Sequence, residues 1–266
     1  MIVLPEIFDI AYSTVRIAPI NTETHYRMAA ACGYPVLKGD IQPTVDGGLV
    51  MCHDSGFTFG EDGRIGKFDR EHNTPIRTLR YDDLLQRQYV PYPSDPPIEE
   101  HVASLDTFLR VCRETGKYAF ITARDKEIPT VVSEMFRLIR KHGMEERCVI
   151  NSFTYETLQE VRKYSSEIPI SHVQGHFWTL TDAIVDGAAD LGNAVISMFS
   201  YPYTEGRTEE AIKTSMPAVE RALGRGMRMF QAILTRPEDR EACLKLGFTG
   251  FQLMEVFPPY AKPPKA

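Results

Sequence analysis

Short apolar segments with the character of strands alternate with longer segments of helical spacing along most of this 266-residue chain. The strand-like segments are 7–12, 35–41, 118–123, 147–152, 168–173, 194–199, 228–233 and 250–254. The helical segments are 21–32, 104–115, 128–142, 154–164, 179–190, 208–224 and 236–246. Strands that alternate with helices form parallel sheets, and eight such units close into a barrel. The sequence therefore predicts an α/β fold, a (β/α)8 TIM barrel, as a single domain over residues 1–266.

Several helix boundaries carry local signals. Asn21 and Ser104 stand where helices begin and are residue types that cap helix N-termini. Gly33, Gly116 and Gly247 stand where helices stop, a position that favours glycine. These signals support the alternation of elements.

Residues 55–103 do not follow the alternation. They are rich in glycine, proline and charged residues, with Pro91, Pro93, Pro96 and Pro97 close together. A loop this long is unusual inside a compact domain. We interpret the segment as an inserted cap over the mouth of the barrel.

Composition excludes several classes of protein. The net charge of −6, with acids and bases interspersed, disfavours a nucleic-acid partner or an anionic membrane surface. No apolar run is long enough for a transmembrane helix, so no integral membrane association is expected. The five cysteines form no C-x-x-C pair, which predicts buried free thiols and a cytoplasmic location.

Residues 34–54 contain the most concentrated chemistry. Side chains alternate along a strand, so Lys38 and Asp40 share one face of the first strand in this segment. The cluster 46–48, Asp-Gly-Gly, is strong turn chemistry. The return strand would bring His53 and Asp54 back beside Lys38 and Asp40. An ammonium group, carboxylates and an imidazole would then converge, which indicates a catalytic site.

The same segment resembles the glycerophosphodiester phosphodiesterase family. The family motifs are E-x-D, a T-x-D-G turn and a strand that ends in H-D, and the matching residues here are Lys38-Gly39-Asp40, Thr44-Val45-Asp46-Gly47 and His53-Asp54. Weaker matches are Pro19-Ile20-Asn21-Thr22, Ser104-Leu105-Asp106, Asn151-Ser152-Phe153 and Gly247-Phe248-Thr249-Gly250-Phe251. The resemblance implies a phospholipase C-like TIM barrel with a hairpin and insertion after the second strand. It also implies phosphodiester hydrolysis in lipid metabolism, with Mg²⁺ or Ca²⁺ as cofactor.

The sequence departs from the family pattern at the catalytic and metal positions. The family has H-R-G on the first strand, and the corresponding region here is Ala11-Tyr12-Ser13-Thr14, which has no histidine. Lys38 stands in place of the glutamate of E-x-D, and Thr122 in place of a second ligand glutamate. The resemblance therefore implies a degenerate active site, with no metal and no cofactor, and leaves open whether the chain is an enzyme.

The predicted site is built from strand ends, where barrel enzymes work. His53 is the predicted proton-transfer group, because the pKa of histidine lies near neutrality. Lys38 and Arg124 would offset the charge of an anion in place of a metal, and Asp40 would orient Lys38. The catalytic candidates are His53, Asp40 and Lys38, and the substrate-binding candidates are Arg124, Asp54, Asn151 and His172. Tyr12, His172 or Asp54 could supply a second acid or base.

Three functions remain open from the sequence. The first is metal-independent hydrolysis of a small glycerophosphodiester or a related phosphoester. The second is an inactive barrel that binds a phosphorylated or sugar-like ligand, and the third is a lyase that uses Lys38 as its base. The expected partner in the first two cases is a small-molecule phosphoester or anion. Charged strand ends could also form a purely structural ion-pair cluster, because buried charges are costly unless they are paired or used.

Overall fold

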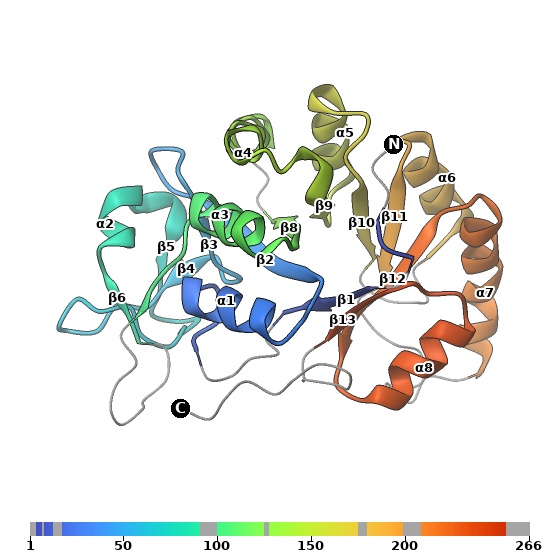
Figure 1. Ribbon diagram of the computed structural model, residues 1–266, viewed down its shortest axis with the longest axis horizontal. Helices are drawn as coiled ribbons and strands as arrows, with labels where there is room; N and C mark the ends of the chain where they lie inside the picture. Colours follow the sequence, from blue (N-terminus) through green and yellow to red (C-terminus); the bar gives the residue numbers. More distant parts are fainter. Residues whose placement is uncertain are drawn as a thin grey trace.

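Eight parallel strands form a closed barrel (Figure 1). The computed structural model describes residues 4–6, 8–12, 18–90, 100–124, 128–174, 180–198 and 209–253. The barrel strands are β1 (Phe8–Ala11), β2 (Val36–Pro43), β8 (Tyr118–Ala123), β9 (Cys148–Ser152), β10 (Ile170–Gln174), β11 (Ala194–Met198), β12 (Arg228–Leu234) and β13 (Gly250–Leu253). Neighbouring strands pair in the order β1-β13-β12-β11-β10-β9-β8-β2, and β2 pairs with β1 to close the ring. The predicted TIM barrel is thus confirmed.

Alternation along each strand separates two cores. Inside the barrel, seven strand residues and Leu4 form an apolar plug. The strand residues of the plug are Phe8, Ile10, Val36, Phe120, Val149, Val195 and Phe230. Residues of the opposite parity, such as Leu37 and Ile121, face the surrounding helices in a larger core. The plug occupies the lower part of the barrel, so the next inward positions along the strands are free to carry polar groups.

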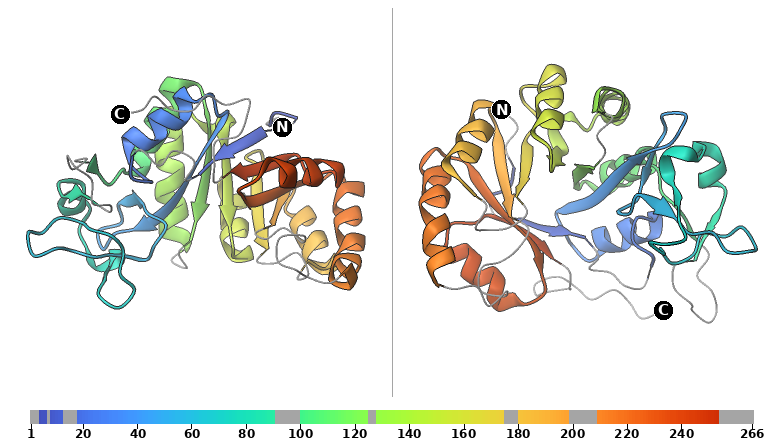
Figure 2. Two further views of the ribbon diagram at one scale, coloured as in Figure 1. Left: turned by 90° about the horizontal axis from the view of Figure 1, so that it is seen from below. Right: turned by 180° about the vertical axis from the view of Figure 1, so that it is seen from behind.

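Helices connect the strands and cover the outside of the barrel (Figure 2). They are α1 (Glu23–Ala31), α3 (Leu105–Thr115), α4 (Ile128–His142), α5 (Tyr155–Tyr164), α6 (Asp182–Asp190), α7 (Glu209–Gly224) and α8 (Pro237–Lys245). In α3 the buried residues Leu105, Phe108 and Cys112 recur at helical spacing and form one apolar face. The hydroxyl of Ser104 accepts a hydrogen bond from the amide of Thr107 at 3.0 Å, which confirms the predicted N-cap.

The N-cap of α1 is Thr22, one residue after the predicted Asn21. The Thr22 hydroxyl accepts a hydrogen bond from the amide of His25. Asn21 has a positive φ of 65°, and its side-chain oxygen accepts a hydrogen bond from the Tyr26 hydroxyl at 3.0 Å. Both residue types cap helices well, so the sequence could not decide between neighbours.

The predicted hairpin is present. Strand β3 (Leu49–Met51) runs antiparallel to the end of β2, with Met51 opposite Ile41. The turn holds Gly47 at a φ of +83°, a conformation that glycine adopts without steric cost. The Thr44 hydroxyl donates a hydrogen bond to the Asp46 carboxylate at 2.7 Å, and this fixes the turn. The hairpin therefore carries the chain back along β2 toward the residues after Met51.

Residues 55–90 and 100–103 contain more regular structure than the sequence indicated. They form β4 (Gly56–Phe57), β5 (Thr74–Pro75), a 3-10 turn (Ile76–Thr78), α2 (Tyr81–Leu85), β6 (Gln88–Tyr89) and β7 (Glu100–His101). Their apolar side chains form a small separate core with Val50 and Cys52 of the hairpin. The insertion lies to one side of the barrel, near α1 and α3 (Figures 1 and 2). The proline-rich segment 91–99 lies outside the described residues, so the cap over the mouth stays a prediction.

Two predictions from composition can be compared with the structure. Among the described residues, no helix combines the length and apolar character needed to cross a bilayer. The five cysteines are all free and buried, as their sequence surroundings predicted. Burial raises the pKa of the Cys52 thiol to about 12, so this thiol stays protonated near neutral pH.

Candidate functional site

The floor of the barrel mouth is a buried ion pair. The Lys38 ammonium donates hydrogen bonds to both carboxylate oxygens of Asp40, at 2.9 and 2.8 Å. The two side chains are only 6% and 1% exposed. Burial lowers the pKa of Lys38, and the adjacent Asp40 carboxylate opposes that shift. The pair is therefore fixed in place and is largely shielded from bulk water.

The backbone between the paired residues has no room for a side chain. Gly39 faces outward, and a Cβ atom built there would lie 2.0 Å from Met51 Cε and 2.9 Å from the Tyr26 hydroxyl. Glycine thus lets β3 and α1 pack closely on the outside of β2 while Lys38 and Asp40 point inward. The K-G-D spacing therefore places the charged pair on the inner face of β2 and a glycine on its closely packed outer face.

Two neighbouring strands complete the charged side of the mouth. Arg124, which follows β8, has its guanidinium 3.7 Å from the Asp40 carboxylate and is 28% exposed. The ring of Tyr12, which follows β1, lies 4.0 Å from the Lys38 ammonium. Burial, and secondarily the Asp40 carboxylate, raises the pKa of the Tyr12 phenol. Tyr12 therefore stays protonated and is suited to donating a hydrogen bond rather than losing a proton.

His53 lies at the rim of the same site. The amide of Cys52 donates to the carbonyl of Asp40 at 2.8 Å, and this bond delivers His53 beside the charged floor. The imidazole Nδ1 lies 3.1 Å from the Asp54 carboxylate, and its ring centroid is 6.2 Å from that of Tyr12. Both members of the His53–Asp54 pair are 40% exposed. The hairpin therefore contributes one buried pair and one accessible pair.

These groups surround a cavity of about 50 Å³ at the mouth of the barrel. Its lining residues are Tyr12, Lys38, Asp40, His53, Thr122, Arg124, Asn151, Phe153, Val173, Ser197, Ala232, Ile233 and Gln252. The Asn151 amide donates to the Thr122 hydroxyl at 3.1 Å, whereas its side-chain oxygen is buried with no partner among the described residues. A buried acceptor without a partner indicates a place for water or for a ligand hydroxyl.

The opposite side of the mouth carries apolar side chains beside the polar Asn151, Ser197 and Gln252. Phe153, Val173 and Ile233 line the cavity from the ends of β9, β10 and β12. Phe153 and Ile233 are 42% and 39% exposed, which is unusual for large apolar side chains in this protein. The Arg124 guanidinium lies 5.5 Å from the centre of the Phe153 ring, so the charged and apolar sides meet there.

Ile233 adopts a strained conformation. Its φ is +60°, an outlier for a β-branched residue, and such strain costs on the order of 1–3 kcal/mol. The register between β12 and β13 shifts between Gln231 and Leu234. This bulge places two consecutive residues, Ala232 and Ile233, against the cavity.

The structure brings together most of the predicted site residues. Lys38, Asp40, His53, Arg124 and Asn151 all line the mouth cavity, and Asp54 contacts His53. The seventh residue, His172, is not among the lining residues. Its parity along β10 is opposite to that of Val173, and its ring lies 6.1 Å from the ring of Tyr155 on α5. Burial lowers the pKa of His172, which suits a neutral ring packed outside the barrel.

Sequence reasoning missed the apolar side of this cavity. Phe153 is the last residue of the match at 151–153, but no sequence pattern indicates that its ring is exposed. Ile233 ends a predicted strand, and nothing in an apolar run announces a bulge. Whether a residue at a strand end is exposed in the cavity depends on which of its faces the strand turns toward the barrel axis, and the sequence does not show this.

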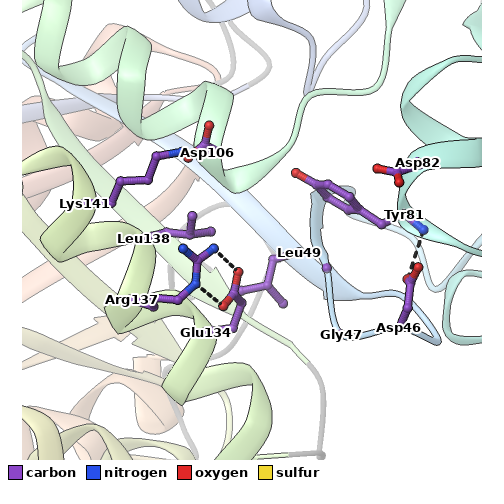
Figure 3. Close-up of a pocket in the computed structure, with 11 residues that line it drawn as sticks. Asp46, Gly47, Leu49, Tyr81, Asp82, Asp106, Glu134, Arg137, Leu138 and Lys141 are labelled. Carbon is purple, nitrogen blue, oxygen red and sulfur yellow. Dashed lines mark hydrogen bonds and ion pairs between the residues drawn. The ribbon is translucent and has the colours of Figure 1, made fainter.

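A larger cavity, of about 400 Å³, lies outside the barrel between the hairpin turn, α2, α3 and α4 (Figure 3). Its basic groups are already paired with acids. Arg137 donates two hydrogen bonds to Glu134, and Lys141 donates to Asp106 at 2.6 Å. Its lining holds more carboxylates than basic groups, so the field there repels phosphate. The mouth cavity is smaller but presents cations to a ligand.

The mouth offers few ligands for a metal ion. Within the described ranges, no group of three or more His, Cys, Asp and Glu side chains is placed to hold one. Both oxygens of Asp40 already accept hydrogen bonds from Lys38, whose ammonium repels a second cation. Divalent ions of the Mg²⁺ and Ca²⁺ type require several oxygen ligands. The described residues at the mouth therefore do not fit such an ion.

A comparison with known families assigns the chain. The sequence model of the glycerophosphoryl diester phosphodiesterase family matches residues 16–251. This chain belongs to that family. A glycerophosphodiester phosphodiesterase of Caldanaerobacter subterraneus is 21% identical over 238 residues, which are 87% of this chain and 87% of the relative. The family resemblance found in the sequence is thus confirmed.

Solved structures of family members share the fold. A protein from Silicibacter pomeroyi, assigned to the glycerophosphoryl diester phosphodiesterases, superposes with a TM-score of 0.76 at 17% identity, over 94% of this chain and 90% of its own. A phosphodiesterase of Oleispira antarctica, in complex with its product sn-glycerol-3-phosphate, superposes with a TM-score of 0.72 at 14% identity, over 93% and 92%. At these identities the similarity establishes the barrel fold alone.

Proposed function

We propose that this protein is a glycerophosphodiesterase-like barrel that binds a phosphoester with fixed cations and works without a metal. The observation that carries the proposal is the position of the Lys38 ammonium. The ammonium donates hydrogen bonds to both oxygens of Asp40. The family resemblance implies that this aspartate is a metal ligand in other members. A fixed cation can offset the charge of a phosphate as a metal does.

The charges at the mouth favour an anion. At the floor, Lys38 and Arg124 contribute two positive charges and Asp40 one negative charge. A second carboxylate, Asp54, lies at the rim against the His53 imidazole and is not among the residues that line the cavity. The Lys38 ammonium has three hydrogens, of which Asp40 takes two, so the third can bind a phosphate oxygen. Arg124 is partly exposed and presents a planar fork that matches phosphate geometry.

His53 is the group proposed for proton transfer. Asp54 contacts Nδ1, which leaves Nε2 as the nitrogen that can accept or donate a proton. The Tyr12 hydroxyl stays protonated because its pKa is raised, and its hydrogen bond to the Asp40 carboxylate helps to hold that carboxylate in place. The Oleispira relative binds sn-glycerol-3-phosphate, and the unpartnered Asn151 oxygen here could accept a hydrogen bond from a glycerol hydroxyl.

A second candidate function is a binding barrel without catalysis. The observation that favours it is the shortage of a second proton-transfer group beside His53. Of the three candidates for a second acid or base, Tyr12 has a raised pKa that makes it a reluctant acid, Asp54 contacts His53 itself, and His172 does not line the cavity. Phosphodiester cleavage needs a proton for the leaving oxygen, so only an activity measurement separates the two functions.

Anion binding is tested by thermal melting in inorganic phosphate. Phosphate that binds the folded state raises the melting temperature by mass action. The Arg124→Gln variant should lose most of that rise. Arg137→Gln, which removes an arginine from the outer cavity, is the matched control and should keep it. Equal responses from the two variants would place the anion somewhere other than the mouth.

Metal independence is tested with Lys38→Glu. The substitution sets a second carboxylate beside Asp40 and removes the repelling ammonium. The melting temperature of this variant should rise with Mg²⁺ or Ca²⁺, whereas that of the parent should not. Elemental analysis of the parent, purified without chelator, should find no stoichiometric divalent ion. A bound ion in the parent would contradict the proposal.

Activity is tested by release of glycerol 3-phosphate from glycerophosphodiesters. Turnover should persist in EDTA and fall about 10²–10⁴-fold in His53→Ala, the usual contribution of general acid or base catalysis. Turnover abolished by EDTA would contradict metal independence. Phosphate binding without any turnover would establish the binding barrel instead.

A further inference from the structure

The mouth of the barrel has two sides of different chemistry. The charged half holds Lys38 on β2 and Arg124 after β8, with the neutral Tyr12 after β1. The apolar half holds Phe153, Val173 and Ile233 at the ends of β9, β10 and β12, with Asn151 on β9 and Ser197 on β11 as polar residues among them. Strand order alone puts these residues on adjacent arcs of one ring.

The two halves touch at Arg124. Its guanidinium lies 5.5 Å from the centre of the Phe153 ring and 3.7 Å from the Asp40 carboxylate. An anion held by Arg124 therefore lies beside an exposed aromatic face. A substituent carried by that anion has apolar surface within reach as soon as the anion is bound.

Ile233 supplies an independent observation. A β-branched residue at a φ of +60° is strained, and glycine would relieve the strain at this position. The β12 bulge nevertheless presents an isoleucine side chain to the cavity, 39% exposed. Strain of this kind concentrates at ligand-binding sites, where the side chain has a use that stability alone does not explain.

We infer that the ligand of this barrel is a phosphoester with an apolar chain, rather than a fully polar glycerophosphodiester. The phosphate contacts Lys38 and Arg124, and the chain lies against Phe153 and Ile233. This inference rests on the proposed function, because it uses the same anion site. It adds the class of substituent that the phosphate carries.

The test is calorimetric binding of inorganic, ethyl, butyl and hexyl phosphate, each below its aggregation concentration. A fully buried methylene strengthens binding about fourfold, so half-burial on an open wall predicts about twofold per methylene. The parent should therefore bind hexyl phosphate on the order of tenfold more tightly than ethyl phosphate. In Ile233→Gly and Phe153→Ser this ratio should fall close to one. Val45→Ser, which removes a 60% exposed valine from the hairpin turn, is the matched control and should keep the ratio of the parent.

Each outcome decides the inference. If phosphate binds and the parent binds hexyl and ethyl phosphate equally tightly, the inference of an apolar chain is wrong, while the proposed function is not contradicted. A rise with chain length that is equal in the parent and in both variants would mean adsorption elsewhere and would also overturn the inference. If no phosphate binds at all, both proposals fail. Ile233→Gly has a second readout, because it should melt no lower than the parent while it loses affinity for hexyl phosphate.

Discussion

The hairpin at the barrel mouth contributes two acid–base pairs that differ mainly in burial. Lys38–Asp40 is 6% and 1% exposed, whereas His53–Asp54 is 40% exposed on both sides. The buried pair is held between the apolar plug below and the neighbouring strands around it. The rim pair is partly exposed to solvent, and the centroid of the His53 ring lies 6.2 Å from that of the Tyr12 ring. One motif thus provides a fixed charge pair at the floor and, at the rim, the histidine that we propose for proton transfer.

The difference teaches which part of the site the fold depends on. Removal of one partner from a buried pair leaves an uncompensated charge in a poorly solvated place. Removal of one partner from an exposed pair leaves a charge that water solvates. The floor should therefore be sensitive to substitution in stability, and the rim mainly in chemistry.

The largest expected effect is that of Lys38→Met. Loss of the ammonium leaves the Asp40 carboxylate buried, and we expect the free energy of unfolding to fall by about 3–5 kcal/mol. Urea denaturation measures it. Lys163→Met, which removes a 69% exposed ammonium from its surface pair with Glu160, is the control and should cost less than about 1 kcal/mol. A loss below about 1 kcal/mol for Lys38→Met would show that Arg124 alone balances Asp40.

The next effect concerns a titratable group behind the floor. His25 on α1 is 2% exposed, and burial lowers its pKa to about 4, a shift that a hydrogen bond with the Tyr12 backbone only partly opposes. The unfolded chain takes up a proton near pH 6.5 but the folded chain only near pH 4, so stability falls as the pH drops through this window. The whole loss should be on the order of 3 kcal/mol.

Urea denaturation between pH 7 and pH 4 measures the effect of His25. His25→Leu should flatten the dependence in that window, and His72→Leu, at a 76% exposed ring, is the control for the substitution itself. An unchanged slope in His25→Leu would mean that other groups cause the acid sensitivity. The result sharpens the contrast between floor and rim, because it reports how dry the region under the floor is.

A smaller effect is expected at Gly39. This residue lies between Lys38 and Asp40 and packs against β3, the strand that leads to His53 and Asp54. An added Cβ would collide with Met51 on β3 and with the Tyr26 hydroxyl on α1. Overpacking of this kind costs about 1–3 kcal/mol, reduced here because the Met51 side chain is flexible. Gly39→Ala should therefore lower stability and shift the hairpin that carries His53. Gly47→Ala, in the open turn, is a contrast in which the positive φ rather than space is at fault.

Much of the fold could be predicted from the sequence, because eight strands alternate with helices and each strand keeps its period. The floor and rim pairs could be predicted from the K-G-D and H-D spacings on a hairpin with strong turn chemistry. The orientation of β10 could not be predicted. Alternation places His172 and Val173 on opposite faces of the strand but does not show which of the two faces the barrel axis. The bulge at Ile233 breaks the period, and the two-residue strands of the insertion are too short to show one.

The smallest stability effect is expected at the rim. His53→Gln replaces an imidazole that is 40% exposed and whose carboxylate partner is equally exposed, so the free energy of unfolding should change by less than about 0.5 kcal/mol. A double-mutant cycle with Asp54→Asn should give a coupling below about 1 kcal/mol, as exposed pairs do. Urea denaturation of the parent, both single variants and the double variant measures that coupling. A coupling of 2 kcal/mol or more would mean that His53–Asp54 is held as rigidly as Lys38–Asp40, because only a desolvated pair reaches about that strength. The contrast between floor and rim would then fail, and His53 would have to be regarded as a fixed charge rather than a proton carrier.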